Sequence, residues 1–156
     1  MATTQDAFRK AEAAELLAAE IYRALANLFA WDLEGAALFR RLEQEEQQHA
    51  ARVRLLAARL RQDRRLLQDV DVDTGVLDAL VAESRALLAD IVEGRWTFGI
   101  ERTKQAAAEF EDRLAHAHAE MIARGAHPVV REFFETLAQQ DAAHLELIRL
   151  EFEPGE

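Results

Sequence analysis

The two halves of this chain carry the same pattern of acidic, imidazole and apolar residues, and this internal repeat limits the possible folds more than any other feature. Glu111 lies 96 residues after Glu15, and an alanine precedes each glutamate by four residues. The acid-x-x-His pair at 141–144 lies 95 residues after the pair at 46–49, and a phenylalanine precedes each pair by seven residues. Such a repeat indicates two related supersecondary units that pack together.

Apolar residues recur with helical spacing over most of the chain, and polar residues, Gly or Pro stand near each break. Asp73 and Thr74 are the expected N-cap residues of a short third helix, which Gly94 closes, and Thr97 is the expected cap of the fourth. Two long helices, a long crossover that contains a short helix, and two more long helices are typical of a bundle of two hairpins. We therefore predict an all-α protein that forms a single domain over residues 1–156. The expected helices cover residues 6–28, 35–67, 75–93, 97–124 and 128–152.

Composition limits the partners and the chemistry of any site. The formal net charge of -10 creates a field that repels nucleic acid and anionic lipid and attracts cations. No run of residues is apolar enough for a membrane span, and the stretch from Met1 to Lys10 lacks the apolar region of a signal peptide. We therefore expect a soluble, cytoplasmic protein. The chain contains no Cys, so a metal site would use oxygen and imidazole ligands.

Six side chains with metal-binding groups follow from the repeat, and each of the four long helices contributes at least one. An acid and a His three residues apart leave the same face of a helix, but such pairs also fit a salt-bridged surface. The repeat favours a shared interior position instead. Glu15 is preferred to Glu12 and Glu20 because it matches Glu111, which itself competes with Glu109. The candidate ligands are Glu15, Glu46, His49, Glu111, Asp141 and His144.

The charges of these residues indicate the kind of metal. Four carboxylates carry about four negative charges, which two divalent cations would neutralise in a low-dielectric core. A sulfur-free set of carboxylates and imidazoles favours iron or manganese over structural zinc, although ligand type alone leaves zinc open. Tyr22 is either a packing residue or a hydrogen-bond donor to a ligand carboxylate. His118 is a third imidazole ligand, a donor to a ligand, or a packed core residue.

At these residues the chain resembles the rubrerythrin-like branch of the ferritin-like superfamily, over residues 10–148. The strongest stretches are 39–49, with the sequence FRRLEQEEQQH, and its counterpart at 128–144. The resemblance implies a ferritin-like four-helix bundle, two iron ions held by the six candidate ligands, and Tyr22 as a tyrosine that supports a ligand. It also implies a homo-oligomer, with a homodimer favoured.

The chain departs from the family pattern at three points. Asp141 stands where the family usually has Glu, which shortens the arm by one methylene group. His118 replaces the expected second tyrosine. A Cys-rich rubredoxin segment is missing, so a peroxidase cycle would need an external electron donor.

Three functions are compatible with these residues. The first, which we expect, is a di-iron oxidoreductase that acts on hydrogen peroxide or dioxygen as a peroxidase, or on Fe(II) as a ferroxidase. The second is a ferritin-like protein that binds or stores iron without turnover. The third is a metal-free helical module for protein interactions, in which the repeat is a remnant.

Overall fold

The structure is a computed structural model, and it describes residues 3–62, 73–124 and 128–152. All regular secondary structure in these residues is helical, so the predicted all-α class is confirmed. No described helix combines enough length with enough apolar character to pass through a lipid bilayer. The end of the second predicted helix, residues 63–67, lies outside the described residues. The helices are α1 (Thr4–Leu28), α2 (Leu33–Gln62), α3 (Gly75–Val92), α4 (Ile100–Arg124) and α5 (Pro128–Phe152).

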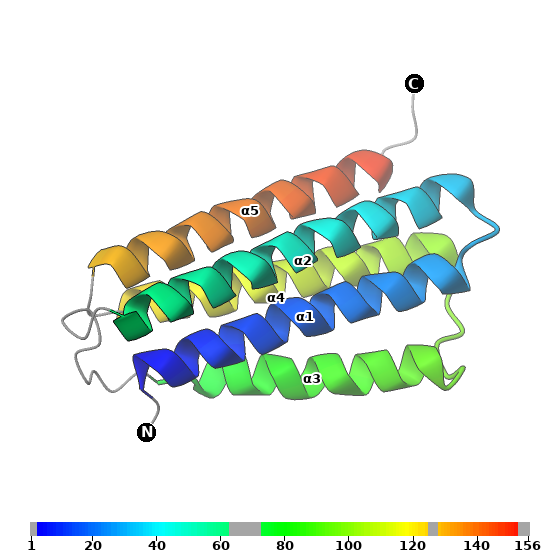
Figure 1. Cartoon of the computed structure of the whole chain (residues 1–156). Coiled ribbons are helices and arrows are strands. Elements are labelled where there is room, and N and C mark those ends of the chain that lie inside the picture. Colours follow the sequence, from blue (N-terminus) through cyan, green and yellow to red (C-terminus); the bar gives the residue numbers. More distant parts are fainter. Residues whose placement is uncertain (1–2, 63–72, 125–127, 153–156) are drawn as a thin grey trace.

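The four long helices lie side by side, and the shorter α3 lies along the outside of α1 (Figure 1). α1 packs along α2, and α4 packs along α5, so each repeated half of the sequence forms one helical hairpin. α3 connects the two hairpins in sequence and packs mainly on α1 and to a lesser extent on α4. One side of the molecule therefore carries an additional helical layer.

Local sequence accounts for the start of α1 and for its connection to α2. α1 begins with a capping box. The Thr3 hydroxyl accepts a hydrogen bond from the backbone N–H of Asp6, and the Asp6 carboxylate accepts one from the backbone N–H of Thr3. The Asp32 carboxylate accepts from the N–H of Gly35 at 2.9 Å in the first turn of α2. A Cβ atom at Gly35 would lie 2.7 Å from Cδ1 of Ile100, so the glycine permits the close approach of α2 to the start of α4.

Thr74 stands before α3 as predicted, but its hydroxyl does not cap the helix. It accepts a hydrogen bond from Nζ of Lys10 on α1 at 2.8 Å and donates to the carboxylate of Asp78 at 3.1 Å. The neighbouring Asp73 carboxylate accepts from the N–H of Gly75 at 2.9 Å. The residues that begin α3 therefore also attach this helix to α1.

The predicted cap at Thr97 is wrong, because α4 begins at Ile100. After α3 the chain turns at Gly94, whose φ of 78° lies in the left-handed region that glycine adopts readily. Trp96 then donates from Nε1 to the hydroxyl of Thr103 at 2.9 Å. This hydrogen bond holds the connecting segment against the first turn of α4 and leaves Thr97 ahead of the helix.

Aromatic rings at repeat-related positions form equivalent contacts in the core. Phe39 and Phe134 correspond in the repeat, and both are fully buried. The ring of Phe39 stacks on that of Tyr22 with centroids 6.4 Å apart, and the ring of Phe134 lies 6.0 Å from that of His118. Tyr22 and His118 also correspond in the repeat. The repeat in the sequence is therefore also a repeat in packing.

Burial along α2 predicts different costs for the same substitution at two positions. Leu42 is fully buried, whereas Leu55 is 71% exposed. We expect Leu42→Ala to lower the free energy of unfolding by about 2–5 kcal/mol, because lost transfer energy and a cavity add together. Leu55→Ala should change it by less than about 0.5 kcal/mol. Denaturant unfolding followed by circular dichroism, without added metal, measures both values, and equal losses would contradict the packing described for α2.

Candidate metal centre

The structure brings the six candidate ligands together in one buried group between α1, α2, α4 and α5. The four carboxylates have no exposed surface, and the two imidazoles are almost fully buried. A third imidazole, from α4, is buried with them. Burial of so many ionisable groups is costly unless each has a partner of opposite charge or a proton. The group comprises Glu15, Glu46, His49, Glu111, His118, Asp141 and His144.

The glutamates that compete with Glu15 and Glu111 in the sequence lie elsewhere. Glu12 forms an ion pair with an arginine of α2, and Glu20 and Glu109 are exposed. Each residue turns a helix by about 100°, so neighbouring acids point in different directions. Of the competing acids, Glu15 and Glu111, which the match between the two repeated halves favours, are therefore the buried ones.

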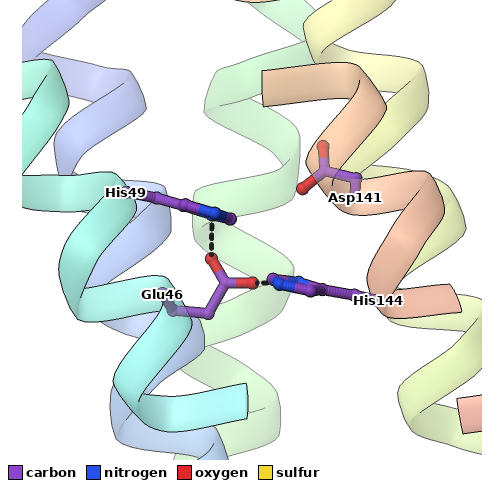
Figure 2. A group of neighbouring side chains, drawn as sticks. All are labelled: Glu46, His49, Asp141 and His144. Atoms are coloured by element: carbon purple, nitrogen blue, oxygen red, sulfur yellow. Dashed lines mark ion pairs between the residues drawn. The ribbon is translucent and has the colours of Figure 1, made fainter. Parts of the chain in front are cut away.

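Glu46 lies between two imidazoles, as Figure 2 shows. Its Oε2 is 3.4 Å from Nδ1 of His49, and its Oε1 is 2.9 Å from Nδ1 of His144. The two rings are nearly parallel, with centroids 5.1 Å apart. The carboxylate of Asp141 points toward the same space from α5 (Figure 2). Ligand atoms of these four residues lie within 4.8 Å of one another, so this group could hold a metal ion.

His118 connects Glu15 with Asp141. Its Nε2 lies 3.2 Å from Oε1 of Glu15, and the other oxygen of this glutamate is 3.7 Å from Nδ1 of His49. Its Nδ1 lies 2.5 Å from Oδ2 of Asp141. Glu15, His118 and Asp141 form a second group whose ligand atoms lie within 4.8 Å of one another. His118 therefore contacts the site through both nitrogens instead of only filling the core.

Tyr22 donates a hydrogen bond from its hydroxyl to Oε1 of Glu111, so it is more than a packing residue. Oε2 of the same glutamate is 3.5 Å from Nδ1 of His144. Nε2 on the other side of this imidazole lies 2.5 Å from Oε2 of Glu45, whose side chain is 30% exposed. Glu45 was not among the residues predicted from the sequence. Its counterpart in the second half is Gln140, so the repeat gave no signal for it.

Burial and the neighbouring charges shift the pKa values of Glu15 and Glu46 in opposite directions. Burial, together with the charges of Glu15 and Glu111, raises the pKa of Glu46 well above its usual range. Burial also favours a higher pKa for Glu15, but contacts with Glu46 and with two imidazoles outweigh it and lower this pKa overall. In the absence of a bound cation, Glu15 therefore ionises at a lower pH than Glu46 does.

His118 and Asp141 form a charged pair at neutral pH. Burial opposes protonation of the imidazole, but the charge and hydrogen bond of Asp141, together with the nearby carboxylate of Glu15, raise the pKa of His118 to about 10. Burial raises the pKa of Asp141 to about 6, although His118 acts in the opposite direction. At pH 7 the carboxylate is ionised, so Nδ1–H of the imidazole donates the hydrogen bond between them.

Nine buried side-chain atoms of this group make no hydrogen bond. They include both oxygens of Glu15 and of Glu46 and one inward-facing nitrogen of each imidazole. The nitrogen and oxygen atoms that face each other are 2.9–3.7 Å apart. Neighbouring ligands of one ion are about 3.0–3.4 Å apart when the metal bonds are about 2.1 Å long. Buried polar atoms are rarely left without partners, so the donor set and its spacing both fit a metal ion.

Comparison of the chain with protein-family models, with curated proteins and with solved structures gives no match. Neither a family nor an activity therefore follows from similarity to these proteins. The chemistry of the site has to be inferred from its own residues and their geometry.

The surroundings of Tyr22 predict how it ionises. Burial, followed by the charge of Glu111, raises the pKa of Tyr22 well above its usual range. The neutral phenol therefore stabilises the fold below pH about 10, and this contribution is lost as the pH rises through the raised pKa. Tyr22 is the only tyrosine of the chain, so phenolate absorption reports on it alone.

We expect no phenolate absorption until alkali unfolds the helices. An alkaline titration followed by ultraviolet absorption and circular dichroism measures both events, and Tyr22→Phe supplies the tryptophan baseline. Ionisation near pH 10 with unchanged helical content would contradict the buried hydrogen bond to Glu111.

Proposed function

We propose that this chain is a di-iron carboxylate protein of the rubrerythrin-like type with a ferritin-like bundle. In this proposal it acts as an oxidoreductase on hydrogen peroxide or dioxygen, or on Fe(II) as a ferroxidase. The observation that carries the proposal is the convergence of buried carboxylates and imidazoles, without sulfur, from four different helices. Carboxylate and imidazole ligands suit iron and manganese, and the resemblance of the two acid-x-x-His segments to rubrerythrin-like proteins favours iron.

The charge of the site supports two divalent ions. Its four carboxylates carry up to four negative charges, which two divalent cations would balance. Protons on Glu46 and His118 supply part of this balance when no cation is bound. A bound cation would displace such protons, because ligand atoms must be deprotonated.

The residues of the site have separate tasks in this proposal. His49 and His144 would be terminal ligands of the bound ions, and Glu46 lies between the two rings and contacts both. Tyr22 fixes the orientation of Glu111 through its hydrogen bond. Hydrogen bonds of this kind from outside the ligand set orient ligands and tune metal affinity.

The chain controls the water and protons around the site. Bound iron would supply two electrons, one per ion, which with two protons convert hydrogen peroxide to two waters, and an external donor would restore them. Phe39 and Phe134 pack beside Tyr22 and His118 and exclude water there. Glu45 is partly exposed and contacts Nε2 of His144, so it can pass protons between this imidazole and solvent.

A matched pair of substitutions on α1 tests the metal site. Glu15 is fully buried in the site, whereas Glu20 is exposed on the same helix. We expect the unaltered protein and Glu20→Gln to bind two Fe(II) per chain, and Glu15→Gln to bind iron at least about ten-fold more weakly. Anaerobic loading, removal of excess metal and elemental analysis measure the binding. Exposure to air should then produce a near-ultraviolet absorption that Glu15→Gln lacks.

The alternatives make different predictions for the same samples. Less than about 0.2 metal per chain in the loaded unaltered protein would contradict the proposal and favour a metal-free helical module. Two bound ions that never oxidise in air or peroxide would contradict the enzymatic part and favour iron binding without turnover.

The raised pKa values predict that metal binding releases protons. Glu46 holds its proton to a higher pH than an ordinary glutamate, and the pKa of Asp141 is raised to about 6. A cation competes with these protons, so its affinity should increase as the pH rises and fall steeply below about pH 6. Calorimetric titrations in buffers of different ionisation enthalpy count the released protons. A binding heat that is independent of the buffer would contradict the prediction.

A further inference from the structure

The two halves of the site differ at a position that the repeat relates. Tyr22 in the first half corresponds to His118 in the second, and both are fully buried. Each faces the glutamate of the opposite half, because the Tyr22 hydroxyl donates to Glu111 and Nε2 of His118 lies 3.2 Å from Oε1 of Glu15. An imidazole therefore occupies a place that is otherwise equivalent to that of a phenol.

The bonding of these two side chains differs. The hydroxyl of Tyr22 has its hydrogen bond, but Nε2 of the buried His118 has none. The other nitrogen of His118 is held by Asp141 at 2.5 Å. His144 has the same arrangement, since Nε2 is 2.5 Å from Glu45 and Nδ1 faces the site without a hydrogen bond. An imidazole held at one nitrogen by a carboxylate, with the other nitrogen free, is the usual arrangement of a metal-binding histidine.

Asp141 retains an oxygen for an ion while it holds His118. Its Oδ2 accepts the hydrogen bond from Nδ1, and its Oδ1 is buried without a partner. Asp141 corresponds in the repeat to Glu46 and is one methylene shorter. Asp141 and the additional imidazole of His118 belong to the same half of the site. The two residues that differ from their counterparts in the first half therefore contact each other.

We infer that His118 binds a metal ion through Nε2 at the position of Glu15, and that the two metal positions of the site are therefore unequal. The inference rests on the proposed function, because it requires a bound metal. Glu15 has an imidazole beside each oxygen, with His118 at Oε1 and His49 at Oε2.

The position of Glu111 has fewer nitrogen donors. This glutamate has His144 beside Oε2, but the hydroxyl of Tyr22 occupies Oε1. Imidazole donors suit late first-row divalent ions such as Co(II) and Zn(II). The Glu15 position therefore binds these ions more tightly than the Glu111 position does.

Replacing His118 by tyrosine, which is the residue at the equivalent position of the first half, tests the inference. Co(II) titration followed by visible absorption should show two binding steps in the unaltered protein, with dissociation constants at least about ten-fold apart. His118→Tyr should weaken the tighter step by about 10–100-fold and bring the two steps together. His116→Ala is the control, because His116 is exposed on the same helix. It should leave both steps unchanged.

A measurement on the unaltered protein covers the case in which His118→Tyr fails to fold. Zn(II) is added, and the ring nitrogens of the histidines are followed by heteronuclear NMR. We expect Nδ1 of His118 to keep its proton and Nε2 to take the chemical shift of a metal-bound nitrogen.

The outcomes separate this inference from the proposed function. Two zinc ions bound per chain with Nε2 of His118 still protonated would overturn the inference and leave the proposed function standing. The same holds if His118→Tyr folds and binds Co(II) in two steps identical to those of the unaltered protein. Failure of the unaltered protein to bind Co(II) or Zn(II) would overturn both.

Discussion

The burial of several like charges in one interior is the constraint on which the rest of the structure depends. Four fully buried carboxylates face one another, and each buried ion without compensation would cost several kcal/mol. Imidazoles lie beside two of them: Glu15 contacts His118 and His49, and Glu46 contacts His49 and His144. This arrangement lowers the repulsion, but it leaves many ligand atoms without hydrogen bonds. These atoms are therefore the ones that a bound cation would engage.

The helical arrangement explains where this site meets solvent. α3 covers α1 and touches α4, whereas among the described residues no helix covers α2 and α5 on their outer side (Figure 1). His49 and His144 come from these two helices and are the only members of the group with measurable exposure, at 4% and 3%. Glu45, also on α2, is partly exposed beside them. Within the buried group, the two imidazoles on the α2 and α5 side therefore lie nearest to solvent.

Features that repeat in the sequence, or that follow from a local residue pattern, could be predicted. Features that depend on a single contact between distant parts of the chain could not. Glu15 and Glu111 could be chosen among neighbouring acids because each supports the other at an equivalent position. The residues alone left Tyr22 as either a packing residue or a hydrogen-bond donor to a ligand, because that choice depends on the distance between α1 and α4. Thr97 has the chemistry of a cap, but the hydrogen bond of Trp96 to the helix overrides this local preference.

The two halves of the site differ in residue type yet balance their charge in the same way. In the first half, Tyr22 is neutral and Glu46 keeps its proton to a raised pH. In the second half, His118 is positive and Asp141 is negative, and they contact each other. Each pair is therefore neutral in the absence of a bound cation, so the exchange of both residues adds no net charge to the core. Glu and Asp carry the same charge when ionised, so the exchange of Tyr for His is the difference that alters the charge of the core, and the contact with Asp141 compensates it.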